Sequence, residues 1–154
     1  MSTPRFEFTD FMNALEAAAN QHGLIKDVIK GQSYQVGQRK NIDYPLCFIE
    51  LDVSISVTAA VTTCQMAFQV LDQTQDKVDN QVGPLDKTYQ IGKEILLLFY
   101  YNNQDTLLNL VEQPSWNALP MIQAYPDNVL GWRFEFTIEA PTVFNRCDIP
   151  LNEY

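Results

Sequence analysis

Residues 47–57 have the sequence Cys-Phe-Ile-Glu-Leu-Asp-Val-Ser-Ile-Ser-Val, and this stretch decides the fold. Every odd position is apolar, whereas the even positions include Glu50, Asp52, Ser54 and Ser56. Strict alternation over eleven residues is typical of a β-strand with one packed face and one polar face. The stretch therefore predicts a long amphipathic strand.

A second alternating stretch follows in the opposite phase. Residues 64–70 are apolar at every even position, with Gln65 and Gln69 between them. The change of phase requires a turn or a bulge within residues 58–63, although that segment lacks Gly, Pro, Asn and Asp. We therefore predict a long antiparallel hairpin over residues 46–71 with an unusually β-prone tip.

Two helices are expected around the hairpin. Thr9 and Asp10 are a helix-start signal, and apolar residues recur at helical spacing from there to Gly23. Pro84 occupies a favoured first helical position, and its helix should end near residues 102–103. Between the helices and strands, residues 26–40 are interpreted as a loop with room for a short strand at 34–36, and residues 104–115 as either more helix or loop.

Two further strands close the predicted fold. Residues 119–125 are interpreted as a strand, residues 126–128 as a turn, and residues 132–138 as a clearly alternating strand that Pro141 stops. The order of helix, two strands, helix and two strands predicts the α+β class. We expect a single domain over residues 1–154, in which two helices pack on one face of an antiparallel sheet of about four strands.

The charge of the chain excludes some partners. The net charge is −9, from 19 acidic and 10 basic residues, and the basic residues are scattered. Binding to nucleic-acid phosphates needs clustered Lys and Arg, so neither tight nucleic-acid binding nor binding to an anionic membrane is expected. The longest apolar run, residues 95–101, is far shorter than a membrane span, and residues 1–5 begin no apolar signal segment. We expect synthesis in the cytoplasm.

The residues that usually carry chemistry are few. The three cysteines, Cys47, Cys64 and Cys147, have neither CxxC spacing nor an even count, so buried reduced thiols are expected. The single histidine, His22, follows a predicted helix, where a capping role is the default. No phosphate-loop, dinucleotide, metalloprotease or nucleophile-elbow motif occurs, so we expect no cofactor and no metal.

The carboxylates form two candidate pairs. Glu50 and Asp52 share one face of a predicted strand, as do Glu135 and Glu139. Paired carboxylates can serve glycoside hydrolysis, but the polar face of an alternating strand is normally its solvated face. The aspartates of residues 72–86 lack the Gly and the terminal Glu of a calcium loop. We therefore predict that the protein is not an enzyme.

The layout resembles the tail-terminator and tail-completion (neck) proteins of tailed bacteriophages. The resemblance rests on the element order and on three segments: residues 89–95 (Tyr-Gln-Ile-Gly-Lys-Glu-Ile), residues 127–132 (Asp-Asn-Val-Leu-Gly-Trp) and residues 147–150 (Cys-Asp-Ile-Pro). It implies a structural subunit of the virion that forms a homo-oligomeric ring and contacts other neck, portal or tail proteins. DNA would pass through the ring without specific binding. The alternative is a small soluble protein-binding adaptor or immunity-like module that acts as a monomer or dimer.

The sequence also suggests where a ring would make its contacts. A strand of eleven to twelve residues spans roughly 36–40 Å, about the full width of a domain of this size. The outer half of the hairpin should therefore overhang the core and form the inter-subunit interface, with Val53, Ile55, Val57 and Val61 as its apolar residues. The polar, acidic segment of residues 72–83 is predicted to be an assembly loop, and its Asp72, Asp76 and Asp79, or Glu50 and Asp52 on the hairpin, to face the bore.

Overall fold

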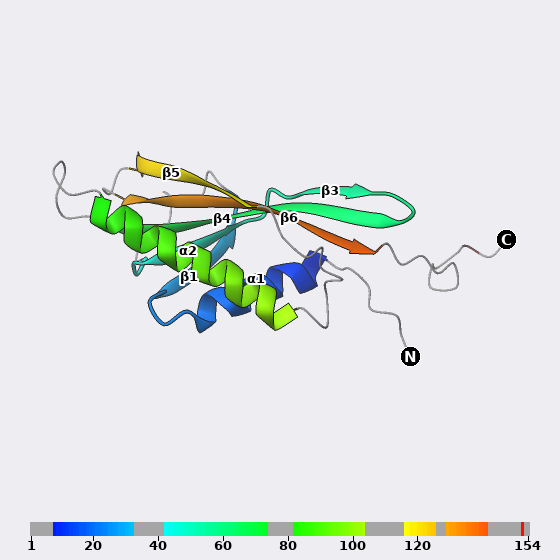
Figure 1. Ribbon diagram of the computed structural model, residues 1–154, viewed down its shortest axis with the longest axis horizontal. Coiled ribbons are helices and arrows are strands. Elements are labelled where there is room, and N and C mark those ends of the chain that lie inside the picture. Colours follow the sequence, from blue (N-terminus) through cyan, green and yellow to red (C-terminus); the bar gives the residue numbers. More distant parts are fainter. Residues whose placement is uncertain are drawn as a thin grey trace.

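The protein folds into two helices and one mixed β-sheet (Figure 1). The structure is a computed structural model that describes residues 8–32, 42–73, 82–103, 116–125, 129–141 and 152. The elements are α1 (Phe8–Gln21), β1 (Asp27–Gly31), β2 (Leu46–Glu50), β3 (Ser54–Val57), β4 (Val61–Gln73), α2 (Val82–Asn103), β5 (Trp116–Tyr125) and β6 (Val129–Pro141). The strand order is β1-β2-β4-β6-β5, and β3 pairs with β4 outside this path. The predicted α+β class is confirmed.

Both helices pack against one face of the sheet and enclose the main core with it (Figure 1). Leu15 of α1 and Ile95 of α2 are fully buried there, together with Phe68 of β4 and Phe134 of β6. The rings of Phe68 and Phe134 stack with their centroids 5.2 Å apart. The even positions of residues 64–70 all belong to this core, so the predicted change of phase is confirmed.

The predicted hairpin is present, but one of its arms is broken. Ile49 lies opposite Phe68 in β4, whereas Ser54 lies opposite Gln65. Five steps along the first arm therefore match three steps along β4, and the two extra residues form an irregular break at residues 51–53 between β2 and β3. The turn between β3 and β4 falls at residues 58–60, within the segment that the phase change indicated.

The sheet has six strands with mixed pairing, so the prediction of about four antiparallel strands was wrong. The break divides the first arm of the hairpin into β2 and β3. In addition, β1 forms within the segment that was interpreted as a loop, and it pairs with β2 in parallel. Its sequence, Asp-Val-Ile-Lys-Gly, carries little alternation, and the open edge of β2 stabilises it as a strand. The possible strand at residues 34–36 lies outside the described residues.

Most of the remaining boundaries agree with the sequence, but β5 and β6 each begin three residues earlier than predicted, at Trp116 and Val129. Helix α1 begins and ends within two residues of the predicted signals, and α2 ends at Asn103 as expected. Pro84 lies in the first turn of α2 and not at its first position, because the helix begins at Val82. Strand β6 extends to Pro141, where it was expected to stop. Residues 104–115 and 126–128 lie outside the described part.

A smaller apolar cluster covers part of the opposite face of the sheet. Its buried members are Ile29, Leu46, Phe48, Leu71 and Val129, and Ile42 and Tyr44 pack against them. All five residues of β2 are consequently buried, so this strand does not have the solvated polar face that alternation predicted. The end of β2 thereby places a carboxylate, that of Glu50, inside the protein.

Candidate functional site

The outer half of the hairpin projects from the body of the protein. Figure 1 shows β3 with the adjoining parts of β4 and β6 extending beyond the ends of both helices. All four residues of β3 are exposed, including Ile55 at 43% and Val57 at 64% of their full surface. These are β-branched apolar side chains at a sheet edge, which is where strands from other chains can add.

The four residues predicted for an interface do not all lie on this projection in the same way. Ile55 and Val57 are exposed on β3, as the prediction requires. Val53 lies in the break before β3 and is half-buried against the main core, so much of its surface is already used within the chain. The backbone of Val61 pairs with that of Pro141, and its side chain lies outside the described part.

The residues predicted for the acidic loop are also divided. The prediction that Asp72 lies in the loop was wrong, because β4 continues to Gln73. Asp72 is held in the strand by its pairing opposite Leu130 of β6. The Asp72 carboxylate lies 3.4 Å from the Nζ atom of Lys87, which offsets its charge. Asp76 and Asp79 lie outside the described residues.

A buried ion pair crosses the sheet face opposite the helices. Glu50 is 2% exposed, and its Oε2 and Oε1 accept hydrogen bonds from Arg133 Nε at 2.8 Å and Nη2 at 3.2 Å. The Gln69 amide donates a third hydrogen bond to Glu50 Oε2, at 3.2 Å. Arg133 Nη1 also contacts the Glu135 carboxylate. The guanidinium therefore holds two carboxylates from different strands.

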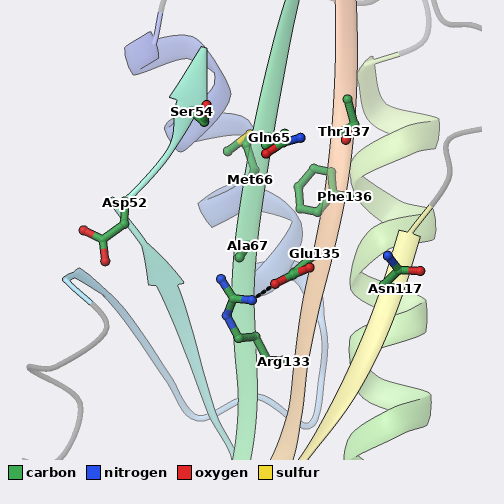
Figure 2. A pocket seen from close by; sticks show the side chains of 10 residues that line it. All are labelled: Asp52, Ser54, Gln65, Met66, Ala67, Asn117, Arg133, Glu135, Phe136 and Thr137. Carbon is green, nitrogen blue, oxygen red and sulfur yellow. Dashed lines mark ion pairs between the residues drawn. The ribbon is translucent and has the colours of Figure 1, made fainter. Parts of the chain in front are cut away.

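A hollow of about 240 Å³ adjoins this ion pair. Figure 2 shows the polar residues that line it: Arg133, Glu135 and Thr137 from β6, Gln65 from β4, Ser54 at the start of β3, and Asn117 from β5. Met66, Ala67 and Phe136 add a smaller apolar part. Asp52 lies at its rim, in the break between β2 and β3, with its carboxylate directed away from β4 (Figure 2). The wall is mainly polar and has more acidic than basic side chains. Its arginine is already paired with two carboxylates, so it is poorly suited to bind an anion in the hollow.

Of the two carboxylate pairs expected from the sequence, Glu135 and Glu139 share one face of β6 as predicted, whereas Glu50 and Asp52 do not share one strand. Glu50 is the last residue of β2 and Asp52 lies in the break that follows it, while Glu50 and Glu135 meet at Arg133. Sequence reasoning missed this link. A signal was present in Leu46 and Phe48, which share the parity of Glu50 and are apolar, and thus indicated that this side of the strand is also buried.

His22 joins the end of α1 to α2. Its Nδ1 accepts a hydrogen bond from the Leu24 backbone N–H at 3.2 Å, and its Nε2 lies 2.8 Å from Glu94 Oε2. A ring that accepts at Nδ1 carries its proton on Nε2, from where it donates to the carboxylate. The Nδ1 contact thus stabilises the turn after α1, while the Nε2 contact links that turn to α2.

The two described cysteines are buried free thiols. Burial raises the pKa of Cys47 to about 12 and that of Cys64 to about 11, above the ordinary 9.0 of a thiol. The folded state therefore keeps both thiols protonated. The free energy of unfolding gains nothing from ionisation of these thiols below pH 9, where they are protonated in both states. As the pH rises from 9 towards 11–12, the unfolded chain ionises first, and the stability of the fold falls.

We expect iodoacetamide at about pH 8 to leave Cys47 and Cys64 unmodified in the folded protein, because the reactive species is the thiolate. In denaturant both thiols should be alkylated rapidly, which provides the control. Peptide mass spectrometry measures the modified fraction at each site. Equal rates for Cys47 in the two conditions would contradict its burial.

Other kinds of site receive no support in the described part of the chain. No group of three or more His, Cys, Asp or Glu residues there is placed to hold a metal ion. Among the described helices, none combines the length and the apolar character needed to cross a membrane. In comparisons with known proteins, the chain matches no protein-family model and no curated sequence.

Proposed function

We propose that the chain is a structural subunit of a bacteriophage head–tail junction or tail, of the tail-terminator or neck type, which assembles into a ring. The observation that carries the proposal is the projecting hairpin with its exposed edge strand β3. The element order and the segments that resemble those phage proteins supply the biological setting. No catalytic role is required of any residue in it.

The composition of the projection supports contact with another protein chain. Natural proteins protect edge strands with Lys, Pro, bulges or inward-pointing charges. Strand β3 has the sequence Ser-Ile-Ser-Val and contains none of these residues. The run from Val53 to Leu71 contains no charged side chain, in a chain of which 19% is charged. Copies that each carry a net charge of −9 can therefore approach one another through this uncharged run without bringing carboxylates together.

The net negative charge, which lies outside residues 53–71, supports the passage of DNA. A bore built from a subunit of net charge −9 repels the phosphate backbone and lowers sticking. In a contact between two different surfaces, each subunit uses one surface for the preceding copy and another for the following copy. Repeated by rotation, such a contact closes into a ring.

Size-exclusion chromatography with light scattering tests the proposal, and negative-stain electron microscopy shows whether the assembly has a bore. A closed oligomer with a central opening is the expected result. A chain that stays monomeric at every concentration, or that forms only a dimer, would favour the adaptor-like module over the ring.

Ile55→Lys should leave the subunit folded and abolish its assembly. The Ile55 side chain is 43% exposed in the subunit, but in the proposed ring it is covered, and burying an unpaired ammonium there costs roughly 3 kcal/mol or more per contact. That cost weakens each contact by about two orders of magnitude. Light scattering measures the assembly, and circular dichroism measures the fold.

Leu24→Lys is the matched control, because Leu24 is 53% exposed but lies after α1, near the start of β2 and at the other end of the hairpin from β3. It should assemble like the unmodified chain. If Ile55→Lys unfolds the subunit, Ile55 belongs to the intrachain core beside Cys64, its partner in β4. If Ile55→Lys still forms the ring, the hairpin is not the interface.

A further inference from the structure

We propose that neighbouring copies join edge to edge, the outer edge of β3 in one copy pairing with the outer edge of β6 at residues 137–141 in the next. The sheet would then continue from subunit to subunit. This inference rests on the proposed ring and specifies which two surfaces form its contact.

The first observation is that the projection is a three-stranded ribbon with two open edges. Its central strand is β4, which pairs with β3 on one side and with residues 137–141 of β6 on the other. Strand β5 pairs with β6 only as far as Phe136, opposite Trp116. Within the described ranges, no strand pairs with the outer side of β3 or with β6 beyond Phe136. Each copy therefore has one edge for each of two neighbours.

The second observation is that the two edges match in direction and in level. Strands β3 and β6 are both antiparallel to β4, so they run in the same direction. Ser56 and Glu139 both lie opposite Thr63, which places them at the same level of the ribbon. A head-to-tail repeat that keeps this level sets β3 and β6 side by side in parallel. A two-fold contact would instead pair β3 with β3 in an antiparallel arrangement.

The third observation is that the side chains brought together in this register are compatible. On the face opposite the helices, the Ser56 hydroxyl lies level with the Glu139 carboxylate, the one charged side chain of β3 and of β6 residues 137–141, and it can donate a hydrogen bond to it. On the helix-bearing face, Ile55 lies level with Ile138, since both are opposite Cys64. Ile138 is buried in the main core, so the exposed Ile55 of the neighbouring copy would extend the apolar surface of that core. The contact thus pairs polar with polar and apolar with apolar groups along a strand edge.

Cysteine trapping tests this register directly. In a Cys147→Ser background, which leaves the buried Cys47 and Cys64 as the native thiols of the chain, we combine Ser56→Cys with Glu139→Cys. Directly opposed strand positions are within the range of a disulfide. Mild oxidation should convert the monomer band on a non-reducing gel into a ladder of covalent oligomers that dithiothreitol reverses.

The controls separate the possible contacts. Ser56→Cys or Glu139→Cys alone should remain monomeric on the gel, as should Ile55→Cys with Glu139→Cys, whose thiols lie on opposite faces. Covalent dimers from Ser56→Cys alone would overturn the proposal in favour of a two-fold β3–β3 contact. Light scattering on the unmodified chain distinguishes a failure of the edge pairing from a failure of the ring. An oligomer without a ladder overturns the edge pairing only, whereas a monomer overturns the ring as well.

Discussion

We expect Arg133→Ala to lower the free energy of unfolding by about 3–5 kcal/mol, because it leaves a buried carboxylate without its cation. Glu50 is 2% exposed, and Arg133 supplies two of the three hydrogen bonds that its oxygens accept. The third comes from the Gln69 amide, which cannot neutralise the charge. Urea denaturation measures the change, and an unchanged slope against denaturant would show that the loss arises in the folded state.

Two further variants make this prediction specific. Lys87→Ala breaks the more exposed pair with Asp72, whose atoms are 3.4 Å apart, and should cost less than about 1 kcal/mol. Adding Glu50→Gln to Arg133→Ala removes the uncompensated charge while keeping a group that can bond to Gln69, so it should recover part of the lost stability. Equal losses in Arg133→Ala and Lys87→Ala would contradict the proposed importance of burial.

The parts of the fold that the sequence predicted correctly are those governed by local periodicity. The reversed phase of residues 64–70 and the helical spacing before Gly23 each depend on one element packing against one core. The alternation of residues 47–57 was right about β-structure, but not about the break at residues 51–53 or about the burial of both sides of β2. Strand β1 could not be found in this way. It owes its structure to a parallel partner, β2, that lies fifteen or more residues further along the chain.

The buried ion pair escaped prediction for a related reason. Glu50 and Arg133 are 83 positions apart, and they meet only because β4 lies between β2 and β6 in a particular register. Alternation identifies the side of a strand on which a charge lies, but not what covers that side. The projection of the hairpin was easier to predict, since a strand of its length spans about the full width of a domain of this size.

Two of the segments that suggested the phage resemblance lie against each other in the structure. Tyr89 of α2 packs edge-on against Trp132 of β6, with ring centroids 5.4 Å apart, and the Trp132 indole donates a 2.8 Å hydrogen bond to the Leu85 carbonyl. Each segment also contains a glycine at a close approach, Gly92 on the helix and Gly131 on the strand. These residues join α2 to the sheet, so they carry information about the fold.

The two glycines lead to the second large effect: Gly131→Ala should destabilise the fold by about 3 kcal/mol, and Gly92→Ala by about 1–2 kcal/mol. A Cβ at Gly131 would collide with the Val70 carbonyl oxygen and lie 2.8 Å from its carbonyl carbon, so the backbones of β4 and β6 would have to separate. At Gly92 the collision is with the ring of Phe134, a side chain that can shift at the expense of its stacking on Phe68. Part of that cost is offset, since alanine favours helix by about 1 kcal/mol over glycine.

Gly83→Ala is the control within the same helix, because a Cβ there has no atom within 4 Å. It should be neutral or stabilising by up to about 1 kcal/mol, through helix propensity alone. Urea denaturation of the three variants should therefore rank Gly131→Ala as least stable, then Gly92→Ala, with Gly83→Ala at or above the unmodified chain. Backbone resists displacement more than a side chain does, and this difference sets the order of the first two. A Gly131→Ala protein as stable as Gly83→Ala would mean that β4 and β6 are not as close at Val70 as the register places them.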